Sequence, residues 1–396
     1  MARVLFINGG SEGHVNPTIG VVQELISRGE EVVYFTIEHF RERIEKTGAK
    51  VRTINSEKFL KAFISGGRNN LLERINGLLY TADVMIPDVL EQIEGEHFDY
   101  IIHDSMFGCG RLLAQILNLP AITSCTSFAE REASFDKMLE QLSNKIPQKT
   151  FDEYQRLIAM VKGKYSVEIH SPYEVFCNPA PLTIVYTTKE FQPFGEDFDK
   201  TYKFVGPSII SRQTHENFDF TALERKSPIY ISLGTVFNQA IDFYKRCFEA
   251  FGNTEHIVVM SIGEKVQQSD LGKIPENFIV KNYVPQTEVL KLTQLFITHG
   301  GMNSVHEGLY YGVPLIVIPQ SADQPVIANK VANIGAGIQL KMESLTANQL
   351  SESADYVLNE PLFYKAAAKM KESLQKSVGY QQAADMIFRF MRQYDI

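Results

Sequence analysis

Apolar and polar positions follow one another in a strand, helix, strand order from the start of the chain. The run at 3–8 is apolar enough for a buried strand, and Asn16 with Pro17 predicts a helix start, with the asparagine as cap and the proline at the first helical position. Apolar residues then recur at helical spacing until Gly29. Nearly continuous apolar strands separated by helices are typical of a parallel sheet that is covered on both faces.

Two series of such strands and helices cover the chain. In the first half the further strand candidates lie at 31–36, 50–54, 99–104 and 120–125. In the second half they lie at 229–235, 256–263, 278–284, 295–301 and 313–319. Less regular helical patterns at 55–90 and 130–180 are expected to flank one edge of the first sheet. The predicted class is α/β, with two doubly wound, Rossmann-like domains.

The stretch 204–217 separates the two series and is the predicted linker, because it combines Gly-Pro with polar residues. A chain of 396 residues exceeds the size at which one hydrophobic core stops growing, so two domains are expected. We place these domains at 1–210 and 211–380, and a last helix follows from residue 381.

Composition and charge exclude several classes of partner. The formal net charge of -8 comes from interspersed acidic and basic residues, and no basic stripe indicates a nucleic-acid surface. No apolar run is long enough for a signal peptide or a membrane span. The cysteines lack metal-ligand spacing and favour reduced thiols in the cytosol; they are Cys109, Cys125, Cys177 and Cys247. The sequence predicts a soluble cytoplasmic protein, with a monomer favoured.

The residues just after the apolar run 295–298 are unusually polar, and ligands of doubly wound sheets bind at the carboxyl ends of strands. Gly300 and Gly301 let backbone amides approach an anion, and the start of the next helix adds partial positive charge. Glu307 is spaced to accept hydrogen bonds from both hydroxyls of a ribose. A lone Gly-Gly turn or a lone glutamate is common, but together these residues predict a site for a nucleoside diphosphate.

A longer signature surrounds these residues. It reads YVPQTEVL from Tyr283, FITHGGMNSVHEGLYYGVP from Phe296 and IPQSADQ from Ile318, and it is preceded by GHVNPT and SLGT. This pattern resembles the donor-binding signature of family 1 glycosyltransferases, and within that family it is most similar to the bacterial macrolide and flavonoid glycosyltransferases. The resemblance covers nearly the whole chain. It implies a GT-B fold, in which two facing Rossmann-like domains form an interdomain cleft.

The resemblance implies a UDP-sugar as donor and assigns its contacts residue by residue. Tyr283 would stack on uracil, and the backbone of Val284 would pair with the edge of the base. Gln286 and Glu307 would hold the ribose. The implied diphosphate contacts are His299, Gly301, Asn303, Ser304 and Thr235, and the implied sugar contacts are Asp323 and Gln324. The helix at 381–396 would pack back on the N-terminal domain.

His14 and Asp104 form the predicted catalytic pair. His14 follows the first strand and Asp104 ends the fourth, and these strands are neighbours in the usual 3-2-1-4 order. An imidazole oriented by a carboxylate can deprotonate a hydroxyl. His14 also fits an ordinary turn histidine and Asp104 a helix cap, while His103, a rival base, points to the opposite face of its strand. The family resemblance assigns the catalytic base to His14 and its partner to Asp104.

The implied chemistry is a single displacement with inversion. His14 takes the proton of an acceptor hydroxyl, whose oxygen attacks the anomeric carbon of a hexose, with glucose the expected sugar, and UDP leaves. The amides of Gly300 and Gly301, the helix dipole, Ser304 and His299 meet the charge of the diphosphate, so no metal and no other cofactor is expected. Asp197-Phe198-Asp199 matches a metal-binding DxD pattern but does not follow a strand of the nucleotide half, and we interpret it as fortuitous.

The expected acceptor is a lipophilic small molecule with a hydroxyl group, such as a flavonoid, another phenol or a macrolide. A largely apolar pocket with one base suits such compounds. The predicted lining comes from the irregular segments of the first half, although residues of this kind more often belong to a core; it consists of Phe63, Met85, Met106, Phe128 and Phe135.

Three other functions share parts of this pattern. A UDP-sugar epimerase could use the same diphosphate site, but the pair of His14 and Asp104 is predicted to face an external acceptor. A nicotinamide oxidoreductase needs GxGxxG spacing, and residues 9–13 read GGSEG. A noncatalytic protein that binds nucleotide sugars has no need of His14 and Asp104, but their presence does not exclude it.

Overall fold

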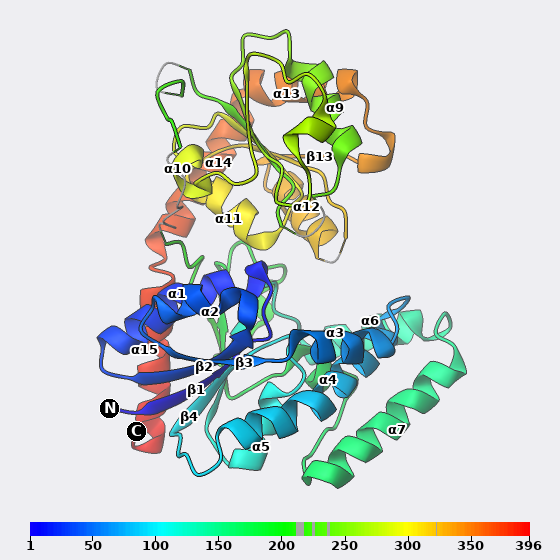
Figure 1. Ribbon diagram of the computed structural model, residues 1–396, viewed down its shortest axis with the longest axis vertical. Coiled ribbons are helices and arrows are strands. Elements are labelled where there is room, and N and C mark those ends of the chain that lie inside the picture. Colours follow the sequence, from blue (N-terminus) through cyan, green and yellow to red (C-terminus); the bar gives the residue numbers. More distant parts are fainter. Residues whose placement is uncertain (211–217, 224–225, 236–237, 322) are drawn as a thin grey trace. The chain divides into compact units, whose positions relative to one another are not determined.

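Two compact units make up the chain (Figure 1). The computed structural model describes residues 1–210, 218–223, 226–235, 238–321 and 323–396. The first unit comprises Met1–Ser208 and Val378–Ile396, and the second comprises Ile209–Ser377. Residues 211–217, which include part of the predicted linker and the predicted start of the second domain, lie outside the described residues.

A parallel sheet of seven strands forms the centre of the first unit, in the order β3-β2-β1-β4-β5-β6-β7. The strands are β1 (Arg3–Ile7), β2 (Glu31–Ile37), β3 (Lys50–Ile54), β4 (Tyr100–Asp104), β5 (Ala121–Cys125), β6 (Leu182–Val185) and β7 (Tyr202–Phe204). The first five strands agree with the sequence prediction. The pattern misses β6 and β7, because runs of four and three residues are too short to show a clear period.

Some helices of the first unit contact strands of this sheet, and others pack on those helices (Figure 1). They are α1 (Glu12–Ser27), α2 (Arg41–Glu45), α3 (Ser56–Ser65), α4 (Leu71–Gln92), α5 (Gly110–Leu117), α6 (Glu132–Ser143), α7 (Gln148–Tyr165), α8 (Pro172–Cys177) and α15 (Tyr380–Met391). The helices α4 and α7 pack against each other, and Leu79, Ile86 and Leu157 from them are fully buried in one core with strand residues such as Ile101.

The start of α1 differs from the prediction, because the helix begins at Glu12 and not at Asn16. The carbonyl of Ser11 already accepts hydrogen bonds from the amides of His14 and Val15, at 3.0 and 2.9 Å, so the first turn closes before the proline. Pro17 lies inside the helix and lacks only the one N–H that would bond four residues back. His14 therefore lies within the first turn of α1 and not in a loop ahead of it.

The second unit contains another parallel sheet, in the order β10-β9-β8-β11-β12-β13. Its strands are β8 (Ile229–Ser232), β9 (Val258–Ser261), β10 (Phe278–Lys281), β11 (Leu295–Thr298), β12 (Leu315–Val317) and β13 (Gly337–Gln339). Its helices are α9 (Ile241–Phe251), α10 (Gln286–Leu290), α11 (Met302–Tyr310), α12 (Gln324–Asn333), α13 (Ala347–Asn359) and α14 (Pro361–Lys376). The short strand β13 was not predicted. The predicted α/β class with two doubly wound parallel sheets is confirmed.

The last helix, α15, belongs to the first unit, where it lies beside α1 (Figure 1). Gly20 of α1 faces Tyr380, and a Cβ atom added at Gly20 would lie 2.6 Å from Cγ of the tyrosine ring. Arg28 at the end of α1 pairs with Asp385 at 2.5 Å. The close approach of the two helices therefore depends on the missing side chain of Gly20.

In the part of the chain that the structure describes, no helix has both the length and the apolar character that crossing a bilayer requires.

The contact of Gly20 with Tyr380 makes a stability prediction. Gly20→Ala is expected to lower the free energy of unfolding by about 1 to 3 kcal/mol, because the new methyl group overpacks the tyrosine ring. Gly163→Ala is the matched control, since Gly163 lies in α7 and a Cβ atom there meets nothing within 4 Å. That variant is expected to gain up to about 1 kcal/mol. Urea denaturation checks both, and equal effects would contradict the packing argument.

Candidate active site

The carboxyl edge of the first sheet brings His14 and Asp104 together. Asp104 is the last residue of β4, which pairs in parallel with β1, and His14 follows β1 in the first turn of α1. The Nδ1 atom of His14 lies 2.8 Å from Oδ2 of Asp104. The carboxylate side chain is 2% exposed and the imidazole 27% exposed. The acid is therefore covered, whereas the ring keeps an accessible edge.

Further contacts fix His14 through both its ring and its backbone. The hydroxyl oxygen of Thr126, just after β5, lies 3.0 Å from the same Nδ1 atom. The side-chain amide of Asn8, just after β1, donates to the carbonyl of His14 at 3.0 Å. The other oxygen of Asp104 accepts from the amide of Met106 at 2.7 Å. The ring has little freedom to turn away from the carboxylate.

These contacts set the tautomer of His14. An ionised carboxylate can only accept hydrogen bonds, so Nδ1 of the neutral ring carries the hydrogen and donates it to Asp104. The hydroxyl oxygen of Thr126 then serves as a second acceptor for the same N–H. Nε2 is left with a lone pair, and an imidazole in this state can take a proton from a hydroxyl group.

His103, the rival base, is enclosed in the core of the first unit. Its side chain has no exposed surface, and its Nε2 atom has no hydrogen-bond partner within the described parts of the chain. Burial lowers the pKa of His103 to about 4, against the opposing effect of its contact with the Asp104 backbone. A substrate cannot reach this ring, so the alternation of the strand separates the two histidines as predicted.

The loop between β11 and α11 has the backbone geometry of an anion site. Gly300 has a φ of +87°, and a Cβ atom there would lie 2.6 Å from Cγ1 of Val317, so only glycine fits. Gly301 caps α11, whose first turn contains Asn303 and Ser304. The amides of a helix's first turn lack intrahelical partners and carry the positive end of its dipole. This start of α11 is therefore suited to a phosphate group.

The ring of His299 packs between Gly234, in the SLGT segment at 232–235, and Gly301 of this loop. A Cβ atom at Gly234 would lie 2.5 Å from Cε1 of the ring, and one at Gly301 would lie 2.5 Å from Nε2. The ring thus fills the space that two glycines leave. Burial lowers the pKa of His299 to about 4, although the charge of Asp323 acts in the opposite direction. Near neutral pH the ring is therefore uncharged, and it forms a hydrogen bond with the backbone of Ser232.

The residues predicted for the ribose lie in hydrogen-bond contact. Nε2 of Gln286, at the start of α10, donates to Oε2 of Glu307 at 2.6 Å and lies 3.5 Å from Oγ of Ser304. Oε1 of Gln286 accepts from the hydroxyl of Tyr230 at 2.9 Å. Glu307 is buried at 3% exposure in α11. The contact between Tyr230 and Gln286 therefore joins segments fifty-six residues apart.

The remaining predicted donor residues have different surroundings. Tyr283 is 44% exposed, and Val284 beside it is buried. Thr235 is exposed, after the end of β8. The ring of Tyr283 therefore presents a surface on which a base could stack.

Asp323 and Gln324 stand at the start of α12, and the charge of Asp323 acts on His299. Oε1 of Gln324 accepts from the amides of Gln320 and Ser321, at 2.8 and 3.1 Å. The carbonyl end of Gln324 is therefore occupied by its own loop, and only its NH₂ group is left to serve a ligand.

The five predicted acceptor residues do not form one group. Met85 and Phe135 are 1% and 0% exposed in the hydrophobic core, so neither presents a surface that an acceptor can touch. Phe63 packs against the same core from α3. Phe128 lies against Phe191, with ring centroids 5.8 Å apart, and Met106 is 39% exposed. Apolar character alone did not separate core residues from lining residues.

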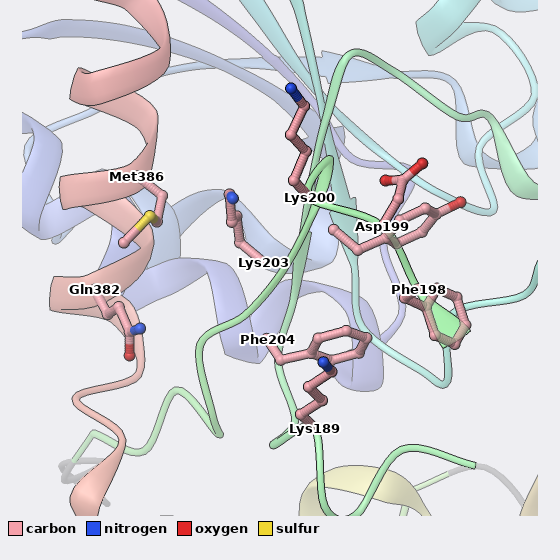
Figure 2. A pocket seen from close by; sticks show the side chains of 9 residues that line it. Lys189, Phe198, Asp199, Lys200, Lys203, Phe204, Gln382 and Met386 are labelled. Atoms are coloured by element: carbon pink, nitrogen blue, oxygen red, sulfur yellow. The ribbon is translucent and has the colours of Figure 1, made fainter. Parts of the chain in front are cut away.

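A pocket of about 390 Å³ lies elsewhere in the first unit, between β7 and α15 (Figure 2). Its described lining is Lys189, Phe198, Asp199, Lys200, Tyr202, Lys203, Phe204, Gln382 and Met386, which includes none of the predicted catalytic, donor or acceptor residues. Phe198 and Asp199 of the DxD match, which we interpret as fortuitous, belong to this lining. Asp197 pairs with Arg131 at 2.9 Å, and Asp199 accepts a hydrogen bond from the amide of Thr201 at 2.8 Å. Both carboxylates have protein partners.

Three contacts of the site escaped the sequence analysis. Thr126 could have been found, because it follows β5 next to β4 and so ends at the same sheet edge as Asp104. Asn8 could have been found in the same way at the end of β1. Tyr230 carries no such signal, since a tyrosine inside an apolar strand reads as an ordinary core residue.

Comparisons with known proteins give the class of protein to which this chain belongs. The model of the glycosyltransferase family 28 N-terminal domain matches residues 4–93. The model of the erythromycin biosynthesis protein CIII-like C-terminal domain matches residues 245–379. One match thus falls in each unit.

Full-length relatives give the family. The chain is 36% identical over 398 residues to an uncharacterized UDP-glucosyltransferase, YojK, of Bacillus subtilis (strain 168), covering 99% of this chain and 98% of that protein. It is 28% identical over 400 residues to the oleandomycin glycosyltransferase of Streptomyces antibioticus, covering 98% of this chain and 90% of that protein. The chain belongs to the nucleoside-diphosphate-sugar glycosyltransferases of the family 1 and family 28 type.

A solved structure supports the fold. The crystal structure of CalG4, the calicheamicin glycosyltransferase, superposes with a TM-score of 0.85 at 27% identity and covers 99% of this chain and 98% of that chain. The predicted GT-B fold and the predicted relation to macrolide glycosyltransferases are confirmed.

The buried His103 makes a prediction for stability against pH. Its pKa in the folded state, about 4, lies below the ordinary value of 6.5, so the unfolded chain binds the extra proton between these values. The free energy of unfolding is therefore expected to fall as pH falls from 6.5 to 4, at up to ~1.4 kcal/mol per pH unit for this residue. His103→Gln should flatten that slope, as measured by urea denaturation across the window. Parallel slopes for the two proteins would contradict this prediction.

Proposed function

We propose that the protein is an inverting, metal-independent UDP-hexosyltransferase that transfers glucose to a hydroxyl group of a lipophilic small molecule, with His14 as general base. The observation that carries this proposal is the 2.8 Å contact between Nδ1 of His14 and the buried carboxylate of Asp104. It pairs an imidazole that retains an exposed edge with an acid that has almost none, which is the arrangement a general base needs.

The proposed proton path uses the two nitrogens of one ring. Nε2 of His14 removes the proton of the acceptor hydroxyl while the hydroxyl oxygen attacks the anomeric carbon. The imidazolium that forms keeps its Nδ1–H on Asp104, whose negative charge stabilises the new positive charge. Because attack comes from the face opposite to the nucleotide, the configuration at the anomeric carbon inverts.

The proposed donor half stabilises the leaving diphosphate. The amides at the start of α11 and the hydroxyl of Ser304 are proposed to donate to the diphosphate, with His299 beside them, and such preorganised donors act where charge develops. Gln286 and Glu307 are proposed to hold the ribose, and Tyr283 the uracil. Asp323 and the NH₂ group of Gln324 are proposed to bind hydroxyls of the sugar.

The choice of glucose and of acceptor class rests on similarity. The relative named as a UDP-glucosyltransferase supports UDP and glucose, and the one named for oleandomycin supports a large lipophilic acceptor. Incubation with UDP-glucose and a panel of phenols and macrolides, read by mass spectrometry, tests both choices. Release of UDP or formation of an epimer without any glycosylated acceptor would reject the proposed transfer.

His14→Ala is expected to lower the rate of transfer by about 10² to 10⁴, because the acceptor hydroxyl loses its base. The affinity for UDP should stay within about twofold of wild type, because the variant leaves the donor residues intact. His97→Ala is the matched control, since the side chain of His97 is 89% exposed in the same unit. Initial rates and calorimetric titration with UDP measure the two effects, and a His14→Ala enzyme with unchanged turnover would eliminate the assignment.

Glu307→Ala is expected to weaken UDP binding by roughly 10-fold to 150-fold, because hydrogen bonds to a charged group contribute about 1.5 to 3 kcal/mol. Calorimetric titration with UDP gives the affinity. Glu372→Ala removes an exposed carboxylate of α14 in the same unit and should leave the affinity unchanged. Unaltered affinity in Glu307→Ala would count against a role in ribose binding.

A further inference from the structure

A buried tyrosine, Tyr230, donates a hydrogen bond to Gln286, one of the two residues proposed to hold the ribose. Tyr230 lies in the central strand β8 at 1% exposure, and its ring stacks on Phe296 of the neighbouring β11, with centroids 4.8 Å apart at 15°. The two residues are direct partners in the register of the sheet. The backbone of Tyr230 is thus held between two strands and its ring by the stacking on Phe296, which restricts the position of its hydroxyl.

The hydroxyl of Tyr230 contacts the side-chain amide of Gln286, which in turn contacts Glu307. An ionised carboxylate accepts hydrogen bonds only, so the NH₂ end of the amide must face Glu307. The carbonyl end must then face Tyr230, whose hydroxyl donates to it at 2.9 Å. Each end of the amide has the partner of opposite polarity.

This chain of contacts makes the amide orientation definite. If the side-chain amide of Gln286 were flipped, its carbonyl oxygen would face the carboxylate of Glu307, and two acceptors would repel each other. Its NH₂ group would face the Tyr230 hydroxyl, which would then have no carbonyl oxygen to donate to. Both hydrogen bonds would be lost or rearranged in a region where unpaired polar groups are costly. Without the Tyr230 hydroxyl, the carbonyl end of the amide loses this donor, and the contacts of its NH₂ end with Glu307 and Ser304 are left to orient it.

We propose that Tyr230 is a positioning residue of the ribose site: through the amide of Gln286 it holds the carboxylate of Glu307 where it accepts the hydroxyls of the ribose. This inference rests on the proposed role of Gln286 and Glu307. Tyr230 does not touch the nucleotide in this scheme and acts only through its hydrogen bond. Its effect on binding must therefore require the ribose hydroxyls to be present.

The test compares two nucleotides that differ only in those hydroxyls, UDP and 2′,3′-dideoxy-UDP. Tyr230→Phe keeps the ring and its stacking on Phe296 and removes one oxygen. It is expected to weaken UDP binding by about 5-fold to 20-fold, in line with the loss of one hydrogen bond. Its affinity for 2′,3′-dideoxy-UDP should stay within about twofold of wild type. Calorimetric titration of the full-length protein measures all four affinities.

Two further variants sharpen the comparison. Tyr364→Phe is the matched control, because its hydroxyl donates to the carbonyl of Gln294 at 3.2 Å in the same unit and contacts none of these residues. It should leave both affinities unchanged. In a Glu307→Gln background the added effect of Tyr230→Phe on UDP binding should shrink, because the two side chains act through one amide.

Each outcome has a definite reading. Equal losses for the two nucleotides, or a ribose preference that survives Tyr230→Phe, would overturn the positioning role of Tyr230 and leave the proposed donor site in place. A wild-type protein that binds UDP and 2′,3′-dideoxy-UDP equally would instead overturn the ribose role of Glu307, and the inference with it. A loss confined to UDP supports the inference.

Discussion

The contact of His14 with the covered carboxylate of Asp104 is the interaction on which the rest of the first unit's chemistry depends. A buried carboxylate is costly unless it is hydrogen-bonded, and here the ring nitrogen and the Met106 amide provide those bonds. The pair exists because β1 and β4 are neighbours and end at the same edge. Sheet topology thus brings two residues ninety positions apart into hydrogen-bond contact.

The second unit applies the same geometry to a different task. Its parallel strands also end at one edge, but the residues there are glycines, hydroxyls and one glutamate. Gly300 permits the sharp turn into α11, and His299 packs against Gly234 and Gly301 as an uncharged ring. In the proposed site, backbone amides and neutral donors would stabilise a diphosphate without a full positive charge at any single residue.

Much of this could be predicted from the sequence, for a physical reason. Strand order places strand ends side by side, so His14 and Asp104 could be paired, and the donor residues carry a long signature. The start of α1 could not be predicted. Asn16 and Pro17 match the local pattern of a helix start, but the carbonyl of Ser11 already accepts the first helical hydrogen bonds.

The residues that line an acceptor pocket could not be predicted either. Met85 and Phe135 are apolar, as a pocket lining would be, but both are buried in the core. Tyr230 was missed for the opposite reason: it looks like a core residue in the sequence, and its proposed role depends on a contact with a residue fifty-six positions away.

The return of α15 to the first unit has a consequence for the order of biosynthesis. Gly20 and its partner Tyr380 are separated by 360 positions along the chain (380 − 20). The first unit therefore cannot finish folding until the ribosome has released α15, whereas the second unit is uninterrupted in sequence. A nascent chain therefore carries an incomplete first unit until α15 has emerged, although all residues of the second unit precede that helix.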